Sequence, residues 1–128
     1  MYLPQQRSIL IVEDDDDLRR LFRFALGVAG YSVKEASDGI QALRLIEQDR
    51  PDLIILDLGL PLLSGLDVQA EIAAHAQTRD IPVVIVTASS AELNGLGVDC
   101  VLRKPVSPDE VVDVVNRCFA AHQRRNRA

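Results

Sequence analysis

Residues 9–14 read ILIVED, an apolar run followed directly by two acidic residues. A second run, LIIL at residues 53–56, precedes Asp57, and a third, VVIV at residues 83–86, precedes Thr87. Short unbroken apolar runs are typical of strands in a parallel sheet that helices cover on both faces. The three runs therefore predict an α/β fold with a parallel sheet.

Polar groups follow these runs at the carboxyl end of each predicted strand. Ligands of open α/β sheets bind outside the carboxyl ends of the strands, so this edge is where chemistry is expected. A lone acidic pair at such a place is more often a helix cap or a surface charge, but polar groups recur here at four predicted strand ends. We take five residues as candidate functional groups: Glu13, Asp14, Asp57, Thr87 and Lys104.

Strands and helices are expected to alternate along the whole chain. The predicted strands are 8–13, 31–36, 52–57, 82–87 and 100–103. Strand 31–36 mixes polar and apolar residues, so we expect it at an edge of the sheet. Helices are expected to begin at Asp15 or Asp16, at 37–39, at Ser64 and at 107–110, where small polar residues can cap a first turn.

The crossover at residues 88–98 is short. A connection between parallel strands that contains a helix needs at least about 10–12 residues. Gly95 and Gly97 also disfavour helix within it. We therefore expect a shortened fourth helix of one or two turns.

Length and composition limit the functional classes. A chain of 128 residues suits one domain, which we place at residues 8–121, between a lead-in at 1–7 and a basic tail at 122–128. The net charge of −5 argues against binding nucleic acid directly. No apolar stretch approaches the roughly 20 residues of a membrane span, and the start lacks a signal-peptide core, so we expect no membrane insertion and a cytoplasmic location.

The acidic edge predicts metal-assisted chemistry. Glu13, Asp14 and Asp57 would repel one another if strands 8–13 and 52–57 are neighbours, so they require a divalent cation or raised pKa values. Oxygen ligands without Cys or His suit Mg²⁺, with Mn²⁺ as an alternative, rather than zinc. A carboxylate beside such an ion can attack phosphorus, and Lys104 and Thr87 could bind the phosphoryl oxygens.

Several motifs together resemble the response-regulator receiver domain of two-component signalling over residues 8 to about 121. They are ILIVED at 9–14, DG at 38–39, PDLIILD at 51–57, Pro61 with Gly65, VTA at 86–88 and KP at 104–105. The resemblance implies a flavodoxin-like doubly wound sheet of five parallel strands, in the order 2-1-3-4-5, flanked by five helices. It also implies a cis peptide bond between Lys104 and Pro105.

The same resemblance implies a role for each site residue. Asp57 would be the phosphoacceptor, Glu13 and Asp14 the acidic Mg²⁺ pair, and the Gly59 backbone carbonyl a further metal ligand. Thr87 and Lys104 would be the signalling hydroxyl and the lysine of the site. The phosphoryl donor would be a sensor histidine kinase or a phosphotransfer protein, and the chain would later hydrolyse its own aspartyl phosphate slowly. It would not otherwise be an enzyme.

Two departures from the family pattern affect the output of the signal. Val101 stands where family members usually carry an aromatic side chain, and the fourth helix is shortened. We therefore expect the segment 88–98 to transmit the change. Gly59 and Ser89 match the family positions that gate the hydrolytic water, so we expect an intermediate rate of dephosphorylation.

Two other functions remain open at this point. A pseudo-receiver would bind partners without phosphorylation, although Asp57, Thr87 and Lys104 argue against it. A phosphatase of the haloacid dehalogenase type would need an acidic residue two positions after its nucleophile, where this chain has Gly59. The kinase, the target, the oligomeric state and the presence of other domains in the full protein cannot be read from the sequence.

Overall fold

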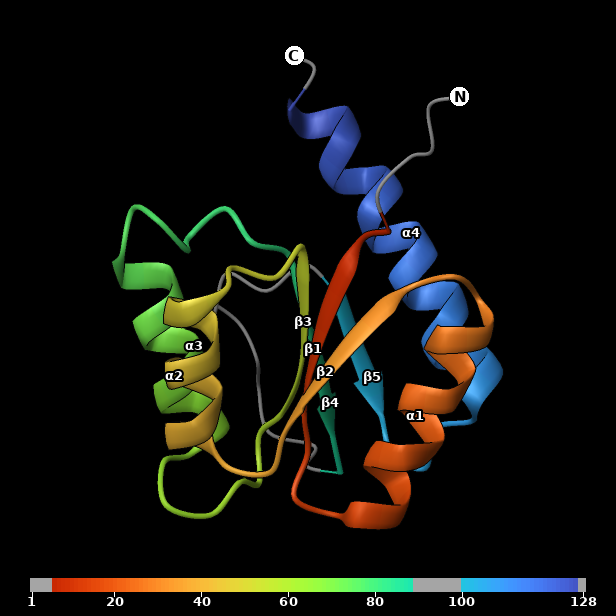
Figure 1. Ribbon diagram of the computed structural model, residues 1–128, viewed down its shortest axis with the longest axis horizontal. Helices are drawn as coiled ribbons and strands as arrows, with labels where there is room; N and C mark the ends of the chain where they lie inside the picture. Colours follow the sequence, from red (N-terminus) through yellow and green to blue (C-terminus); the bar gives the residue numbers. More distant parts are fainter. Residues whose placement is uncertain (1–5, 89–99, 127–128) are drawn as a thin grey trace.

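The computed structural model describes residues 6–88 and 100–126. Its centre is a sheet of five strands, all paired in parallel, in the order β2-β1-β3-β4-β5 (Figure 1). The strands are β1 (Ser8–Val12), β2 (Ser32–Ala36), β3 (Leu53–Asp57), β4 (Val83–Thr87) and β5 (Cys100–Arg103). The predicted fold class, strand order and edge position of β2 are thus confirmed.

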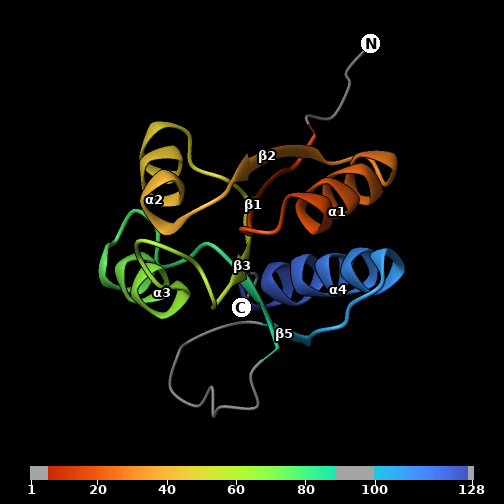
Figure 2. The same cartoon turned by 90° about the horizontal axis from the view of Figure 1, so that it is seen from below.

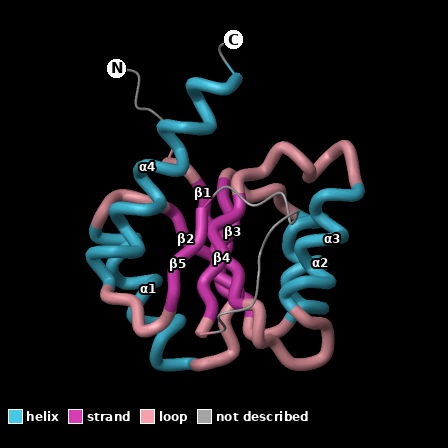
Figure 3. Tube along the Cα trace, turned by 180° about the vertical axis from the view of Figure 1, so that it is seen from behind, coloured by secondary structure: helices cyan, strands magenta, loops and turns pink. Residues whose placement is uncertain are grey.

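Helices cover both faces of the sheet. The helices in the described residues are α1 (Asp16–Val28), α2 (Gly39–Gln48), α3 (Gly65–Ala74) and α4 (Pro108–Asn126). Figures 2 and 3 show α1 and α4 on one face and α2 and α3 on the other. None of these helices, within the described part of the chain, has the length and apolar character needed to cross a membrane.

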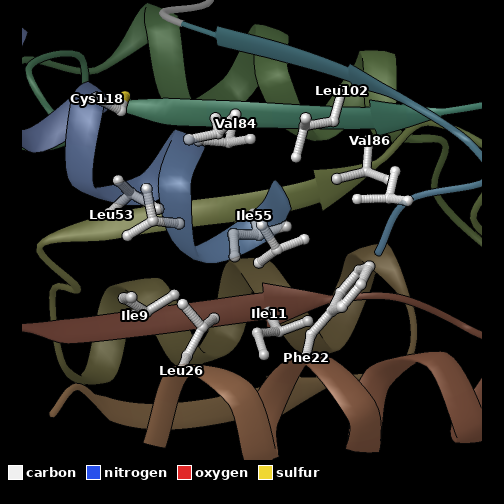
Figure 4. Close-up of a cluster of buried hydrophobic side chains, with 14 of the residues drawn as sticks. Ile9, Ile11, Phe22, Leu26, Leu53, Ile55, Val84, Val86, Leu102 and Cys118 are labelled. Carbon is white, nitrogen blue, oxygen red and sulfur yellow. The ribbon is translucent and has the colours of Figure 1, made fainter. Parts of the chain in front are cut away.

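Alternation along the strands divides the core into two layers. Ile9, Ile11 and Ile55 point to the α1–α4 face, where they pack with Phe22 and Leu26 of α1 (Figure 4). The intervening residues supply the core of the α2–α3 face: Leu10, Val12, Ile54, Leu56, Val83 and Ile85. Both faces of the central strands are therefore buried, which explains their unbroken apolar runs.

The predicted caps begin the helices. The Asp15 carboxylate accepts a hydrogen bond from the Leu18 N–H at 3.0 Å and begins α1. Asp38 begins α2 and Ser64 begins α3 in the same way. Each bond satisfies an N–H group that the first turn leaves without a partner in its own helix.

The end of α1 and the start of α4 also follow the prediction. Gly30, with φ of +102°, lies just after α1, in a conformation that glycine adopts without the penalty of a side chain. At the start of α4, the Ser107 hydroxyl accepts from the Glu110 N–H while the Glu110 carboxylate accepts from the Ser107 N–H, each at 3.2 Å. This is the reciprocal capping box that residues 107–110 predict.

The predicted basic tail overlaps the last helix. The helix α4 continues through Asn126, so residues 122–126 are helical, and its last turns extend beyond the sheet (Figures 1 and 3). Phe119 is the last residue of α4 in the buried core cluster. The short helix and Ser89 fall in residues 89–99, outside the described residues. The division into lead-in, domain and tail stays a prediction.

Candidate functional site

The pairing of β1 with β3 brings the predicted carboxylates together. Asp57 is the last residue of β3, and Glu13 follows β1 directly. One carboxylate oxygen from each of Glu13, Asp14 and Asp57 lies within 4.8 Å of the other two. Glu13 and Asp57 are only 2% and 6% exposed, whereas Asp14 is exposed to solvent. Two carboxylates of the cluster are thus buried, and the third is in contact with solvent.

Glu13 is held from several directions. Its N–H donates to the Ala36 carbonyl at 3.0 Å, and its Oε2 accepts from the Asp15 N–H at 3.2 Å. Its Oε1 lies 3.0 Å from Nζ of Lys104, close enough for an ion pair, yet completes no hydrogen bond with the described residues. Burial raises the pKa of Glu13 to about 7, helped by the neighbouring Asp57 charge and opposed by Lys104.

Lys104 reaches the cluster from the end of β5. Its ammonium lies 3.4 Å from Oδ2 of Asp57, and its backbone N–H donates to the Thr87 carbonyl at 2.9 Å. The peptide bond between Lys104 and Pro105 is cis, as the family resemblance implies. Burial alone would lower the pKa of Lys104, but the carboxylates of Glu13 and Asp57 raise it above its usual value. The lysine therefore stays charged beside both carboxylates.

The main chain around Asp57 is fixed by two glycines. The Gly59 N–H donates to Oδ1 of Asp57 at 3.1 Å. The Gly65 N–H donates to the Leu58 carbonyl at 3.1 Å, and a Cβ on Gly65 would lie 2.3 Å from the Asp57 carbonyl oxygen. Only glycine lets the start of α3 pack this closely against the end of β3. The predicted role of the Gly59 carbonyl as a metal ligand stays a prediction.

Thr87 lies at the same edge of the sheet. It is the last residue of β4 and is 2% exposed. The structure connects Thr87 to Lys104 through the main chain, and the role of its hydroxyl stays a prediction. Val101, on β5, is exposed to solvent.

The donor set fits an oxygen-liganded divalent cation. Three carboxylates meet without Cys or His, which is the ligand chemistry of Mg²⁺ and Mn²⁺. The buried Oε1 of Glu13 lies 3.0 Å from the Lys104 ammonium, and a carboxylate oxygen has a second lone pair that a cation could use. The raised pKa of Glu13 has the same origin, since a buried carboxylate beside Asp57 lacks sufficient positive charge.

The sequence did not single out Arg19 of α1. Its Nη1 donates to the main-chain carbonyl of Glu13, a member of the acidic cluster, at 2.8 Å. The start of α1 also carries Arg20 and Arg23, and nothing in the order of residues distinguishes the one that turns toward the strand end.

Comparisons with known proteins point to one family. The profile described as "Response regulator receiver domain" matches residues 9–116. The chain is 38% identical over 111 residues to the phosphate regulon transcriptional regulatory protein PhoB of Pseudomonas aeruginosa, covering 83% of this chain and 48% of PhoB. It is also 38% identical over 109 residues to the response regulator MprA of Mycobacterium avium, covering 81% and 47%. The chain spans about half the length of these curated relatives.

Solved structures share the fold over most of this chain. The chemotaxis response regulator CheY4 of Vibrio cholerae superposes with a TM-score of 0.83 at 25% identity, covering 89% of this chain and 99% of CheY4. The signal receiver domain of a signal transduction histidine kinase from Syntrophus aciditrophicus gives 0.83 at 28% identity, covering 90% and 91%.

Proposed function

The chain belongs to the family of response regulator receiver domains of two-component signalling, and we propose that Asp57 is its phosphoacceptor. The observation that carries this assignment is the placement of the Asp57 carboxylate. It is buried at the carboxyl edge of the sheet, close to the Glu13 and Asp14 carboxylates and 3.4 Å from the Lys104 ammonium. The arrangement supplies a nucleophile, candidate metal ligands and a positive charge at one place.

Glu13, Asp14 and Asp57 would hold the divalent cation, together with the Gly59 carbonyl. Mg²⁺ fits this set, and Mn²⁺ fits it as well. When bound, such an ion neutralises charge on the phosphoryl oxygens and on the crowded carboxylates. Because Glu13 is buried and already shares Lys104, the ion and the lysine would divide the neutralisation of the cluster between them.

The proposed reaction joins Asp57 to phosphorus. A carboxylate oxygen of Asp57 attacks the phosphorus of a phosphohistidine, an O–P bond forms and the N–P bond breaks. The imidazole nitrogen keeps the electron pair of that bond and takes a proton from solvent. The Lys104 ammonium and the Thr87 hydroxyl would each donate a hydrogen bond to a phosphoryl oxygen. Later attack by water on phosphorus would release inorganic phosphate and restore the carboxylate.

The donor in this proposal is a sensor histidine kinase or a phosphotransfer protein. The chain then acts as a switch whose binding surface changes, and we assign that change to the segment 88–98, most of which lies outside the described residues. PhoB is named as a transcriptional regulatory protein, so the prediction that this chain binds no nucleic acid directly is not confirmed. A cytoplasmic location remains part of the proposal.

The alternative functions gain no support. A dehalogenase-type phosphatase requires an acidic group two positions after its nucleophile, and Gly59 cannot provide it. A pseudo-receiver would not need the buried contact between Lys104 and Asp57, which places a positive charge at the nucleophile.

The experiment is phosphorylation by acetyl phosphate with Mg²⁺, followed by intact-mass analysis. The wild-type chain should gain one phosphoryl group, and removal of Mg²⁺ with EDTA should prevent the reaction. Asp57→Asn should not react, whereas Asp17→Asn, which alters an exposed aspartate of α1, should react like wild type. Robust Mg²⁺-dependent labelling of Asp57→Asn would refute the assignment.

A further inference from the structure

Arg19 lies next to the acidic cluster, and each of its three guanidinium nitrogens has an acceptor within hydrogen-bond distance. Nε contacts Oε1 of Glu35 at 3.1 Å, Nη2 contacts Oδ1 of Asp16 at 2.6 Å, and Nη1 donates to the Glu13 carbonyl at 2.8 Å. The side chain is only 13% exposed. Its three partners belong to the end of β2, the first turn of α1 and the connection between β1 and α1. One side chain thus joins three segments next to the site.

The contact with the Glu13 carbonyl acts on the metal-ligand pair. That carbonyl belongs to the peptide group joining Glu13 to Asp14, and the peptide group is planar. Fixing the direction of the carbonyl therefore also fixes the N–H of Asp14 and limits the directions open to its side chain. The N–H of Glu13 is already bound to the Ala36 carbonyl at 3.0 Å. Hydrogen bonds therefore fix both the N–H and the carbonyl of Glu13.

Asp14 is the cluster member for which this support matters most. Glu13 and Asp57 are buried, whereas Asp14 is exposed and is not held by surrounding core residues. An exposed side chain loses more conformational freedom when it binds an ion, and a fixed backbone lowers that cost. Groups that orient metal ligands through hydrogen bonds commonly contribute about 10–100-fold to metal affinity.

The charge of Arg19 does not oppose this role. A guanidinium near a cation site would repel the ion, but Arg19 is paired with both Asp16 and Glu35. Its positive charge is therefore largely balanced. Its three donors to these acceptors lie on three nitrogens in one rigid plane, whereas the donors of a lysine all lie on a single nitrogen.

We propose that Arg19 is a positioning residue for the Glu13–Asp14 metal ligands and raises the affinity of the site for a divalent cation. This inference rests on the proposed function, because it takes the acidic cluster as the metal site. Arg19 itself touches neither the ion nor the phosphoryl group. Its contribution is the orientation of the peptide group between the two ligands.

Arg23 provides a matched control on the same helix. Its Nη1 contacts Oε2 of Glu35 at 3.1 Å, so it shares an ion-pair partner with Arg19. Its side chain is 61% exposed. Within the described part of the chain, the ion pair with Glu35 is its only ion pair. Arg23→Gln removes an arginine and an ion pair with Glu35 but leaves the Glu13 carbonyl bound. Arg19→Gln removes the carbonyl contact as well.

The test measures Mn²⁺ binding to the intact chain by electron paramagnetic resonance of the free ion. Arg19→Gln should weaken Mn²⁺ binding about tenfold, and Arg23→Gln should leave it essentially unchanged. Urea unfolding in EDTA, measured on the same variants, separates a general loss of stability from a change at the site. Acetyl phosphate labelling of Arg19→Gln should recover when the metal concentration is raised to saturation.

The outcomes separate this inference from the proposed function. If wild type binds no Mn²⁺, or if Glu13→Gln binds it equally well, the metal site itself is wrong. If wild type binds Mn²⁺, Glu13→Gln does not, and folded Arg19→Gln binds as tightly as wild type, only the role of Arg19 is overturned. If Arg19→Gln fails to fold, Arg19→Lys decides, with weakened Mn²⁺ binding in support and unchanged binding against.

Discussion

The Lys104 ammonium lies 3.0 Å from Oε1 of Glu13, a carboxylate that is almost wholly buried. Its distance to Oδ2 of Asp57 is longer, at 3.4 Å. The lysine of this site is therefore shared, and it lies nearer to the proposed metal ligand than to the proposed phosphoacceptor. A cation bound by Glu13 and a phosphoryl group on Asp57 would both favour a shift of the ammonium toward Asp57.

Replacing this lysine should destabilise the chain in a pH-dependent way. Lys104→Met leaves Glu13 and Asp57 buried side by side without the ammonium, which we expect to cost about 1–3 kcal/mol near pH 8. The cost should be smaller near pH 5.5, where Glu13 is protonated and needs no counter-charge. Urea unfolding in EDTA at both pH values measures the difference. An equal cost at the two pH values would show that Lys104 does not act through the charge of Glu13.

Glu13 should also affect the stability of the metal-free wild type. Its pKa rises from 4.5 to about 7 on folding, so the folded chain holds this proton more tightly than the unfolded chain does. The resulting stabilisation is present below about pH 4.5 and is lost as the pH rises through about 7. Glu13→Gln, which cannot titrate, should remove this decline. Unfolding free energies in EDTA across that pH range test the sign, and a parallel decline in both proteins would contradict it.

The close approach of α3 to the end of β3 predicts a large effect at Gly65. A Cβ there would lie 2.3 Å from the Asp57 carbonyl oxygen and 2.5 Å from Cα of Leu58, both backbone atoms. Gly65→Ala should therefore destabilise the chain by about 1–3 kcal/mol or more. Gly27→Ala, within α1, is the matched control, because among the described residues no heavy atom outside the local helix backbone lies within 4 Å of the added Cβ. It should be neutral or stabilise by up to about 1 kcal/mol. Equal effects of the two changes on urea unfolding would argue against the packing account.

Gly59, two residues after the proposed phosphoacceptor, should affect the lifetime of the phosphoryl group. An added Cβ at Gly59 would meet only Oδ1 of Asp57, at 3.8 Å, which is ordinary contact. Gly59→Asn is therefore expected to fold and to place an amide beside the path of the attacking water. The rate of autodephosphorylation, followed by loss of the phosphorylated mass, should change measurably. If substitutions at both Gly59 and Ser89 leave the rate untouched, these positions do not gate the water.

The sequence was sufficient for the fold because each element has a local signal. The apolar runs at 9–12, 53–56 and 83–86 are buried on both faces, and β2, with its alternating polar residues, lies at the edge. Capping residues such as Asp15 and Ser64 determine where helices begin, independently of distant contacts. These features explain why the strands and the starts of the helices could be predicted from local patterns. The strand order was implied by the family resemblance, and the carboxylate cluster depends on the pairing of β1 with β3.

The contacts between distant segments were not predictable in the same way. Which carboxylate lies nearer to Lys104 depends on the register of several strands, and the choice of Arg19 rather than Arg23 depends on the rotation of α1. Such features follow from tertiary packing, for which a linear pattern carries no signal.

The central claim, that Asp57 receives the phosphoryl group, is tested most directly by locating the modified residue. The phosphorylated chain is treated with borohydride, which reduces an aspartyl phosphate to homoserine, and the peptides are then sequenced by mass spectrometry. We predict homoserine at position 57 after incubation with acetyl phosphate and Mg²⁺, and none when EDTA replaces Mg²⁺. Homoserine at Asp14 or any other position, with Asp57 unmodified, would contradict the account.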